Sequence, residues 1–418
     1  MRVDDRYRWL IWLSLSEIGT MLVFSNYSAL LPILQKEWFL TNGQAGWIFS
    51  SYQIGYLLSV AFLISLTDYT QPKYIYILTA FWAGIFGILF SVWAKGFESA
   101  LILRTLTGIG LAGTYMPGLR MVSEKFPPRE RGKAIGIYVG VFSLGVALSS
   151  FLSGFINSLL SWRWAFFLTS LGPIGGGVVA LFRLGDVKTR EADEKGQVPL
   201  IEVLQNRPAL MMIGGYVAHM WEMFGMRAWM VAFLTACLLT ARVDFQKAVN
   251  LSAVIAGVVI LVGAISNALG GLLSDRYGRE NTIIVVMLGS GLFSLLIGWT
   301  RVFPFSLVLI LCILYGFLVT GESSVLSTGV TELARPGGLG RTMALQSMLG
   351  FGAASISPIV FGYVLDLTNP PDSLGRFGYV PNWGWAFGLL GLGGLAGPLI
   401  MWRLKTKVRF LENEKPQS

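Results

Sequence analysis

Apolar residues form long runs along the whole chain, separated by short clusters of charged residues, proline and glycine. Most runs hold about 20 or more residues, the length that a helix needs to cross the hydrocarbon core of a bilayer. Lipid offers the backbone no hydrogen-bond partners, and the runs lack the alternation of barrel strands, so we expect continuous helices. The pattern predicts twelve spans, at residues 9–34, 42–66, 74–94, 99–125, 133–157, 163–184, 208–239, 247–273, 281–300, 304–333, 341–366 and 382–404.

The composition agrees with this pattern. Hydrophobic residues make up 54% of the 418 positions and charged residues 13%, which indicates an all-α membrane protein and not a soluble domain. Cys237 and Cys312 lie inside apolar runs and indicate neither a disulfide nor a metal site, and we expect no metal and no cofactor. Residues 1–10 mix acids with bases and lead into a run without a small-residue cleavage site, which favours a retained first span over a signal peptide.

Lys and Arg are concentrated at both ends of the chain and in the connections that follow even-numbered spans. This bias predicts that both termini are cytoplasmic and that the protein lies in the plasma (inner) membrane. The net charge of +9 follows from the same bias and from attraction to anionic lipid. Membrane lipid is therefore an expected partner, and nucleic acid is not.

The chain has the marks of an internal repeat. Residues 185–207 form its one long hydrophilic connection, and they end in a short amphipathic piece before Pro208. Residues match between the two sides at a nearly constant shift, among them Asp68 with Asp275, Gly108 with Gly316, and Glu124 with Glu332. We therefore expect an N-terminal six-helix bundle at 1–184, a cytoplasmic linker at 185–207 and a C-terminal six-helix bundle at 208–418. Such repeats are typical of alternating-access carriers.

Two motifs resemble those of a known family. Residues 271–280, GLLSDRYGRE, resemble the signature G-x-x-x-D-R-x-G-R-[RK] of the major facilitator superfamily, and they lie between spans 8 and 9, where the family has its second copy. Residues 104–110 resemble its R-x-x-x-G-x-G motif, with Arg104 and Gly108 in register. The resemblance covers essentially the whole chain. It implies two pseudo-symmetric bundles in the major facilitator fold, and we expect a monomer.

The resemblance also implies a gate at the turn between spans 8 and 9. Gly278 permits the chain to reverse, and the family geometry places Asp275 against the cytoplasmic end of span 5 when the inner side is closed. Such a latch contributes about 1–3 kcal/mol; the alternative is a turn that only holds positive charge inside. The first copy at 64–73 has lost both glycines and the central arginine, which puts its role in doubt. The predicted gating residues are Gly271, Asp275, Arg276, Gly278, Arg279 and Asp68.

Charged side chains inside spans cost roughly 2.5–3.5 kcal/mol each and are functional candidates for that reason. They lie in spans 1, 4, 7 and 10, the set that lines the central cavity in this family. We predict that Glu222, then Glu322, then Glu17 couple transport to protons, with His219 as a further candidate that could equally be a packing residue. The alternative is that the three glutamates and the three arginines neutralise one another as structural pairs. Those arginines are Arg104, Arg120 and Arg227.

Other residues of these spans are candidates for the substrate cavity. Residues 219–229, HMWEMFGMRAW, place aromatic and thioether side chains beside titratable groups and predict a cavity wall. The family motif places Arg104 and Gly108 in a packed network between helices instead. The predicted substrate-cavity residues are Arg120, Arg227, Trp221, Trp229, Asn26 and Tyr115.

We predict a secondary active transporter, not an enzyme, which moves a small organic solute by alternating access and is energised by protons. The intramembrane arginines favour an organic anion. The Trp and Met side chains also suit an amphipathic drug, so a multidrug/proton efflux antiporter is the first alternative, although span 5 lacks the G-P-x-x-G-G core typical of such antiporters. A non-transporting receptor or sensor on a carrier fold is the second alternative.

Overall fold

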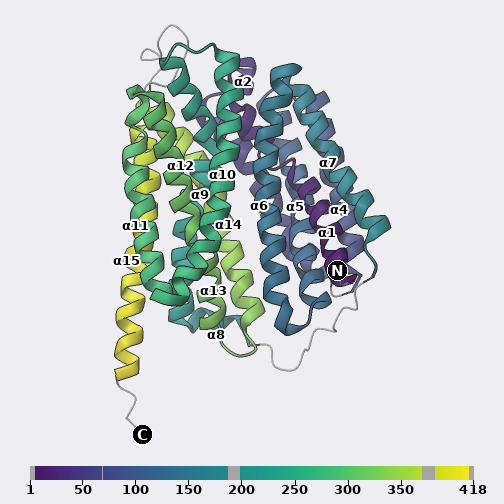
Figure 1. The fold of residues 1–418 in the computed structure, drawn as a ribbon, viewed down its shortest axis with the longest axis vertical. Helices are drawn as coiled ribbons and strands as arrows, with labels where there is room; N and C mark the ends of the chain where they lie inside the picture. The colour runs from purple at the N-terminus through teal and green to yellow at the C-terminus, as the bar shows by residue number, and fades with distance from the viewer. Residues whose placement is uncertain (1–4, 68, 187–197, 370–381, 414–418) are drawn as a thin grey trace. The chain divides into compact units, whose positions relative to one another are not determined.

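The computed structural model describes residues 5–67, 69–186, 198–369 and 382–413. Within these ranges the chain is helical and contains no strand, as the sequence predicts (Figure 1). In the described part of the chain, eleven helical segments are long and apolar enough to cross a membrane. A twelfth candidate, α5 (Phe97–Lys125), is 29 residues long and contains Arg104 and Arg120. The predicted all-α membrane fold is confirmed.

The helix bounds follow the predicted spans to within a few residues at most ends. The N-terminal helices are α1 (Asp5–Met21), α2 (Asn26–Trp38), α3 (Asn42–Leu66), α4 (Pro72–Trp93), α5, α6 (Pro128–Leu159) and α7 (Trp162–Arg183). The predicted amphipathic piece is the short helix α8 (Leu200–Gln205). The remaining elements are α9 (Arg207–Thr240), α10 (Phe245–Tyr277), α11 (Arg279–Ile297), the 3-10 turn η1 (Thr300–Val302), α12 (Phe305–Gly321), α13 (Ser323–Leu333), α14 (Leu339–Thr368) and α15 (Gly384–Asn413).

Two of the twelve spans are not the continuous helices that the sequence predicts. The first, predicted at 9–34, is interrupted at residues 22–25, between α1 and α2. The tenth, predicted at 304–333, is interrupted at Glu322, between α12 and α13. In both places hydrogen bonds from other helices satisfy backbone groups near the interruption, which the local sequence does not reveal.

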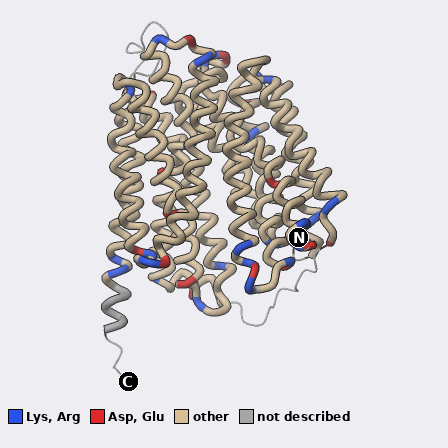
Figure 2. The backbone as a smooth tube through the Cα atoms, viewed as in Figure 1, with Lys and Arg blue, Asp and Glu red and all other residues tan. Residues whose placement is uncertain are grey.

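Local sequence explains many of the helix starts. Thr41 and Gln44 form a reciprocal capping box at the start of α3. Pro72 and Pro128 stand at the first position of α4 and α6, where a missing backbone N–H leaves no donor unsatisfied. Charged residues gather at the helix ends and in the connections, and few lie along the apolar middle of the helices (Figure 2). This distribution is the one expected of helices that cross a bilayer.

The helices pack into two compact units. Unit 1 comprises residues 1–193 and 228–261, and unit 2 comprises residues 194–227 and 262–418. Unit 1 contains α1 to α7, among which α4 packs on α5 and α7, and α3 packs on α5. Unit 2 contains α11 to α15, with α11 packed on α15 and α12. The division into bundles at 1–184 and 208–418 stays a prediction.

Close packing in unit 1 explains one glycine of the motif in span 4. A Cβ at Gly108 of α5 would overlap the backbone carbonyl of Tyr52 in α3. Only glycine therefore allows these two helices to approach so closely at this point.

Candidate functional site

Three intramembrane carboxyl groups are buried, and two of them lie together in unit 2. Glu222 comes from α9 and Glu322 from the interruption between α12 and α13, and neither is exposed at all, with 0% relative accessibility. His219, one turn before Glu222 on α9, is equally buried, and its Nδ1 lies 2.8 Å from Oε1 of Glu322. The sequence predicts each of these three residues as a coupling candidate, and the structure brings them into one cluster.

Glu222 has a neutral partner. The hydroxyl of Ser290 in α11 donates a hydrogen bond of 3.1 Å to Oε2 of Glu222. Tyr315 of α12 also lies against this carboxyl group and donates a hydrogen bond of 3.0 Å to Ser294. Ser290 and Tyr315 were not predicted from the sequence. The feature that could have indicated them is a single hydroxyl side chain within an otherwise apolar span.

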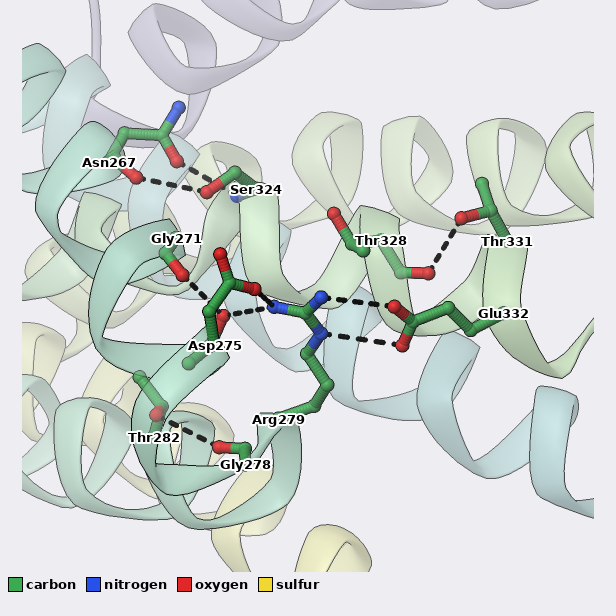
Figure 3. Close-up of polar contacts among 11 residues, drawn as sticks. Asn267, Gly271, Asp275, Gly278, Arg279, Thr282, Ser324, Thr328, Thr331 and Glu332 are labelled. Atoms are coloured by element: carbon green, nitrogen blue, oxygen red, sulfur yellow. Dashed lines mark hydrogen bonds and ion pairs between the residues drawn. The ribbon is translucent and has the colours of Figure 1, made fainter. Parts of the chain in front are cut away.

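The interruption at Glu322 is stabilised from α10. The backbone N–H of Ser324 donates to Oδ1 of Asn267 at 2.8 Å, and the Ser324 hydroxyl donates to the Asn267 carbonyl at 2.9 Å (Figure 3). The side chain of Asn267 thus caps a backbone donor in the first turn of α13, which lacks an intrahelical partner. Glu322 therefore sits at a point where the backbone hydrogen-bond ladder is broken and held by one neighbouring side chain.

Unit 1 holds the third carboxyl group in a different environment. Glu17 of α1 has 0% relative accessibility, and its Oε2 accepts hydrogen bonds from Tyr76 of α4 at 3.1 Å and from Thr20 at 3.2 Å. Both partners are neutral hydroxyls, whereas Glu322 has a histidine partner.

Each of the three carboxyl groups keeps one oxygen without a hydrogen bond. These atoms are Oε1 of Glu17, Oε1 of Glu222 and Oε2 of Glu322, none of which has a partner within the described part of the chain. An unpaired buried charge is costly, so a carboxyl group with a free oxygen is suited to hold a proton. Among the described residues no ion pair joins any of these glutamates to Arg104, Arg120 or Arg227. The alternative of mutual neutralisation therefore finds no support in the structure.

Arg104 stabilises the interruption of the first span. Its Nη1 donates to the carbonyl of Val23 and to Oδ1 of Asn26, each at 3.0 Å, and its Nη2 donates to the carbonyl of Phe24 at 3.4 Å. The guanidinium also lies over the ring of Tyr52, with its Cζ 4.4 Å from the ring centroid. Asn26, which also donates to Thr169 at 3.3 Å, is thus part of this network.

We expect Arg104→Gln to destabilise the protein. The substitution leaves the carbonyls between α1 and α2 without their buried charged donor, a loss of about 3 kcal/mol in the free energy of unfolding. Thermal melting of the purified protein measures the effect, and Arg129→Gln, which changes an exposed arginine near the start of α6, is the control. Equal melting temperatures for the two variants would contradict this role of Arg104.

Arg120 is engaged at the end of α5. Its Nε donates to Oε1 of Glu124 at 2.9 Å, and its Nη1 donates to the hydroxyl of Thr67, the C-cap of α3, at 2.5 Å. The same arginine therefore neutralises Glu124 and joins α5 to α3. These contacts support a structural role for Arg120. Its role in the substrate cavity stays a prediction.

Arg227 differs from the other two arginines. It is half-buried, its Cζ lies 6.0 Å from the ring centroid of Phe224, and it forms no hydrogen bond or ion pair with any residue that the structure describes. Phe224 in turn packs edge-on against Phe351 of α14, with centroids 5.9 Å apart. Arg227 is thus a cation beside aromatic surface and without a carboxylate partner.

The three aromatic candidates lie in different surroundings. Trp221 is half-buried, and its Nε1 has no hydrogen-bond partner within the described ranges. Trp229 is only 1% exposed, so it forms part of the packed interior. The ring of Tyr115 stacks on Tyr138, with centroids 6.1 Å apart.

The turn between α10 and α11 is held within unit 2. Gly278 adopts a φ of 88°, which permits the reversal that the sequence predicts. Arg279 donates to Oδ1 of Asp275 at 2.6 Å and, through Nη2 and Nε, to both carboxylate oxygens of Glu332 in α13 at 3.0 and 3.3 Å (Figure 3). The hydroxyl of Ser274 accepts a further bond from Arg279 and donates to the carbonyl of Gly271. Arg276 is exposed. These bonds tie the turn to the end of α13.

The first copy of the motif lacks this arrangement. Position 72, at the start of α4, is a proline where the second copy has Arg279. Glu124, which corresponds to Glu332, instead forms an ion pair with Arg120. Asp68 lies outside the described residues. The latch between Asp275 and the end of span 5 stays a prediction.

We expect Asp275→Asn to lower the transport rate about ten-fold while changing substrate affinity little. The substitution weakens both the predicted latch and the hydrogen bond from Arg279 to Asp275. A latch worth about 1–3 kcal/mol changes the equilibrium between the closed and open inner side by about ten-fold or more. Asp68→Asn is the matched variant and should have the smaller effect, because the first copy lacks the arginine and both glycines. Rates in proteoliposomes measure the difference, and an equal or larger defect in Asp68→Asn would contradict the asymmetry.

The long apolar helices define this chain as an integral, multi-pass membrane protein. The Major Facilitator Superfamily profile matches residues 13–358 and again 245–417. The chain belongs to the major facilitator superfamily, whose members are transporters and not enzymes.

Several relatives are similar over most of their length. A hexuronate transporter of Bacillus subtilis is 24% identical over 390 residues, covering 87% of this chain and 89% of its own. A probable sulfoacetate transporter of Cupriavidus necator is 25% identical over 83% of this chain and 84% of its own. A 4-hydroxybenzoate transporter of Pseudomonas aeruginosa is 25% identical over 77% of both chains.

Solved structures share the fold. A bacterial homologue of the human lysosomal transporter Spinster has a TM-score of 0.76 at 15% identity, over 97% of this chain and 98% of its own. A point mutant of the nucleoside transporter NupG has a TM-score of 0.75 at 13% identity, over 96% of this chain and all of its own (100%). Both similarities support the major facilitator fold.

Proposed function

We propose that this secondary transporter moves a small organic anion by alternating access and is coupled to protons. The observation that supports the anion is Arg227, a half-buried cation that lacks a carboxylate partner among the described residues. A carboxylate or sulfonate solute would supply that partner, because charge-assisted pairs with arginine are among the strongest polar contacts. Three relatives are named as transporters of hexuronate, sulfoacetate and 4-hydroxybenzoate, all small organic anions, which supports the same class.

The proposed coupling residues are Glu222 and Glu322, with His219 beside them and Glu17 as the third carboxyl group. Each is buried, and each glutamate has one oxygen free of hydrogen bonds within the described ranges. The position of Glu322 at a helix interruption supports its choice. A change in its protonation would alter the contact with His219 at the point where α12 ends and α13 begins, and where the contacts of Asn267 with Ser324 hold the interruption.

The orientation and assembly belong to the same proposal. The bias of Lys and Arg supports cytoplasmic termini in a plasma membrane. In unit 1, Asp5 at the start of α1 and Arg183 at the end of α7 line one cavity, so these two helix ends lie on the same side, as that topology requires. We propose a monomer as the transporting unit.

A thermal-shift screen tests the substrate class. The purified protein is heated with a panel of small carboxylates and sulfonates, their uncharged amides, and cationic amphipathic drugs. A ligand present at 100 times its Kd stabilises the folded state by about 2.7 kcal/mol, which raises the melting temperature measurably. We expect stabilisation by one class of anion and none by its amide.

Two outcomes would contradict the proposal. Stabilisation by cationic drugs alone would favour the multidrug/proton antiporter. Binding of an anion without its flux into proteoliposomes would favour a receptor on a carrier fold.

A further inference from the structure

A charged cavity lies at one end of unit 1, and Glu17 is not among its lining residues. Its volume is about 630 Å³, and it is formed where α1 begins and where α5 and α7 end. The lining combines four cations, one acid and three aromatic rings: Arg6, Arg8, Lys125, Arg183, Asp5, Trp9, Trp12 and Phe182. The proposed function assigns no role to it.

Two of the cations have no acidic partner among the described residues. Lys125 lies with its Nζ 5.6 Å from the ring centroid of Trp9, and Arg183 with its Cζ 4.8 Å from the ring centroid of Trp12. Neither forms an ion pair with a described residue. Arg8 pairs with Asp5 at 3.1 Å, and Arg6 lies 3.5 Å from Glu130. The described lining therefore carries an excess of positive charge, which an anion would balance.

A buried donor is also left unsatisfied. Trp9 is only 6% exposed and lines the cavity, and its Nε1 has no hydrogen-bond partner among the residues that the structure describes. An indole N–H can only donate, so a ligand that satisfies it must provide an acceptor. A buried donor without a partner costs about as much as a lost hydrogen bond, which favours a ligand at this point.

The rim of the cavity is apolar on one side. Phe182 is 77% exposed and directly precedes Arg183, at the end of the membrane-spanning helix α7. Trp and Arg at the ends of spanning helices occupy the headgroup level of a bilayer. The lining thus places phosphate-binding groups beside a surface at the level of the lipid. This combination fits an amphipathic anion embedded in the membrane better than a water-soluble anion.

We propose that this cavity binds the phosphate headgroup of an anionic phospholipid. Lys125 and Arg183 balance its charge, and Trp9 Nε1 donates to a phosphate oxygen. A lipid headgroup and free inorganic phosphate both present a phosphate oxyanion to these residues. The apolar rim favours the lipid over the free ion.

Native mass spectrometry of the full-length protein tests the site. The protein is released from micelles that contain equal amounts of phosphatidylglycerol and phosphatidylcholine, and the retained lipid is counted. We expect retention of phosphatidylglycerol in preference to phosphatidylcholine. Lys125→Gln with Arg183→Gln should reduce that retention about 25-fold, since each of the two cations near an anionic headgroup contributes about five-fold. Trp9→Phe, which keeps the ring but removes the donor, should reduce it about three-fold.

The control double variant is Arg207→Gln with Arg403→Gln, which removes two exposed cations from unit 2 and should leave retention unchanged. Equal loss in this control, or equal retention of both lipids by the unchanged protein, would overturn the proposal. A third arm adds millimolar inorganic phosphate. Displacement of phosphatidylglycerol by phosphate at that concentration would show a site for the free ion and would also overturn it.

Discussion

Glu222→Gln and Glu322→Gln are each expected to abolish solute accumulation driven by a pH gradient while leaving solute exchange intact. Glutamine keeps the volume and hydrogen bonding of the side chain but cannot release a proton. With one proton coupled per solute, a gradient of two pH units supports a concentration ratio of about 100, because each unit is worth about 1.4 kcal/mol. A variant that cannot exchange protons equilibrates its solute, so the ratio should fall to about one.

The measurement is uptake into proteoliposomes with an imposed pH gradient, beside counterflow exchange at equal pH. Glu98→Gln, at an exposed glutamate in the first turn of α5, is the matched control and should keep the full ratio. Glu17→Gln ranks third, because Glu17 belongs to unit 1 and is not part of the cluster that Glu222 and Glu322 form with His219.

Each contrary outcome has a distinct meaning. Full accumulation in all three Gln variants would exclude coupling through these carboxyl groups. Loss of exchange in one variant would instead assign that glutamate to the substrate site or to a structural contact. His219→Gln separates these readings at Glu322, because a coupling pair should lose the pH-driven ratio when either member is changed, whereas a packing contact should lower only the melting temperature.

The apolar pattern predicted the helices because helix formation in lipid depends on local composition. Spans need about 20 apolar residues, and the bounds of α3 agree with the predicted 42–66 at both ends. The interruptions were missed because their cause is not local. Residues 22–25 contain neither proline nor glycine, and the donor that satisfies the carbonyls of Val23 and Phe24 is Arg104, on another helix. The interruption at Glu322 likewise depends on Asn267.

The same limit applies to the candidate site. The cost of burying charge identified the glutamates and arginines from the sequence, because this cost depends only on residue type and depth. It could not distinguish a structural arginine from a free one, since that depends on which helices meet. The family motif predicted a packed network for Arg104, which donates to backbone carbonyls, but nothing in the sequence separated Arg120 from Arg227. Only the contacts of the fold do so, because Arg120 donates to Glu124.

Arg227→Gln is expected to weaken binding of the transported anion about 30-fold or more. Loss of one member of a partly buried charge pair costs at least about 2 kcal/mol, and every 1.4 kcal/mol is a factor of ten in Kd. Arg227→Lys keeps the charge but not the planar fork of donors, so it should recover part of the affinity for a carboxylate. Isothermal titration with the anion identified by thermal shift measures both values.

Arg120→Gln is the matched control, because it removes an intramembrane arginine that already has partners in Glu124 and Thr67. We expect it to lower the melting temperature and to change Kd less than three-fold. Equal losses of affinity in Arg120→Gln and Arg227→Gln would mean that both arginines line the substrate cavity. Unchanged affinity in Arg227→Gln would remove the observation on which the anionic substrate rests, even if proton coupling through Glu222 and Glu322 were found.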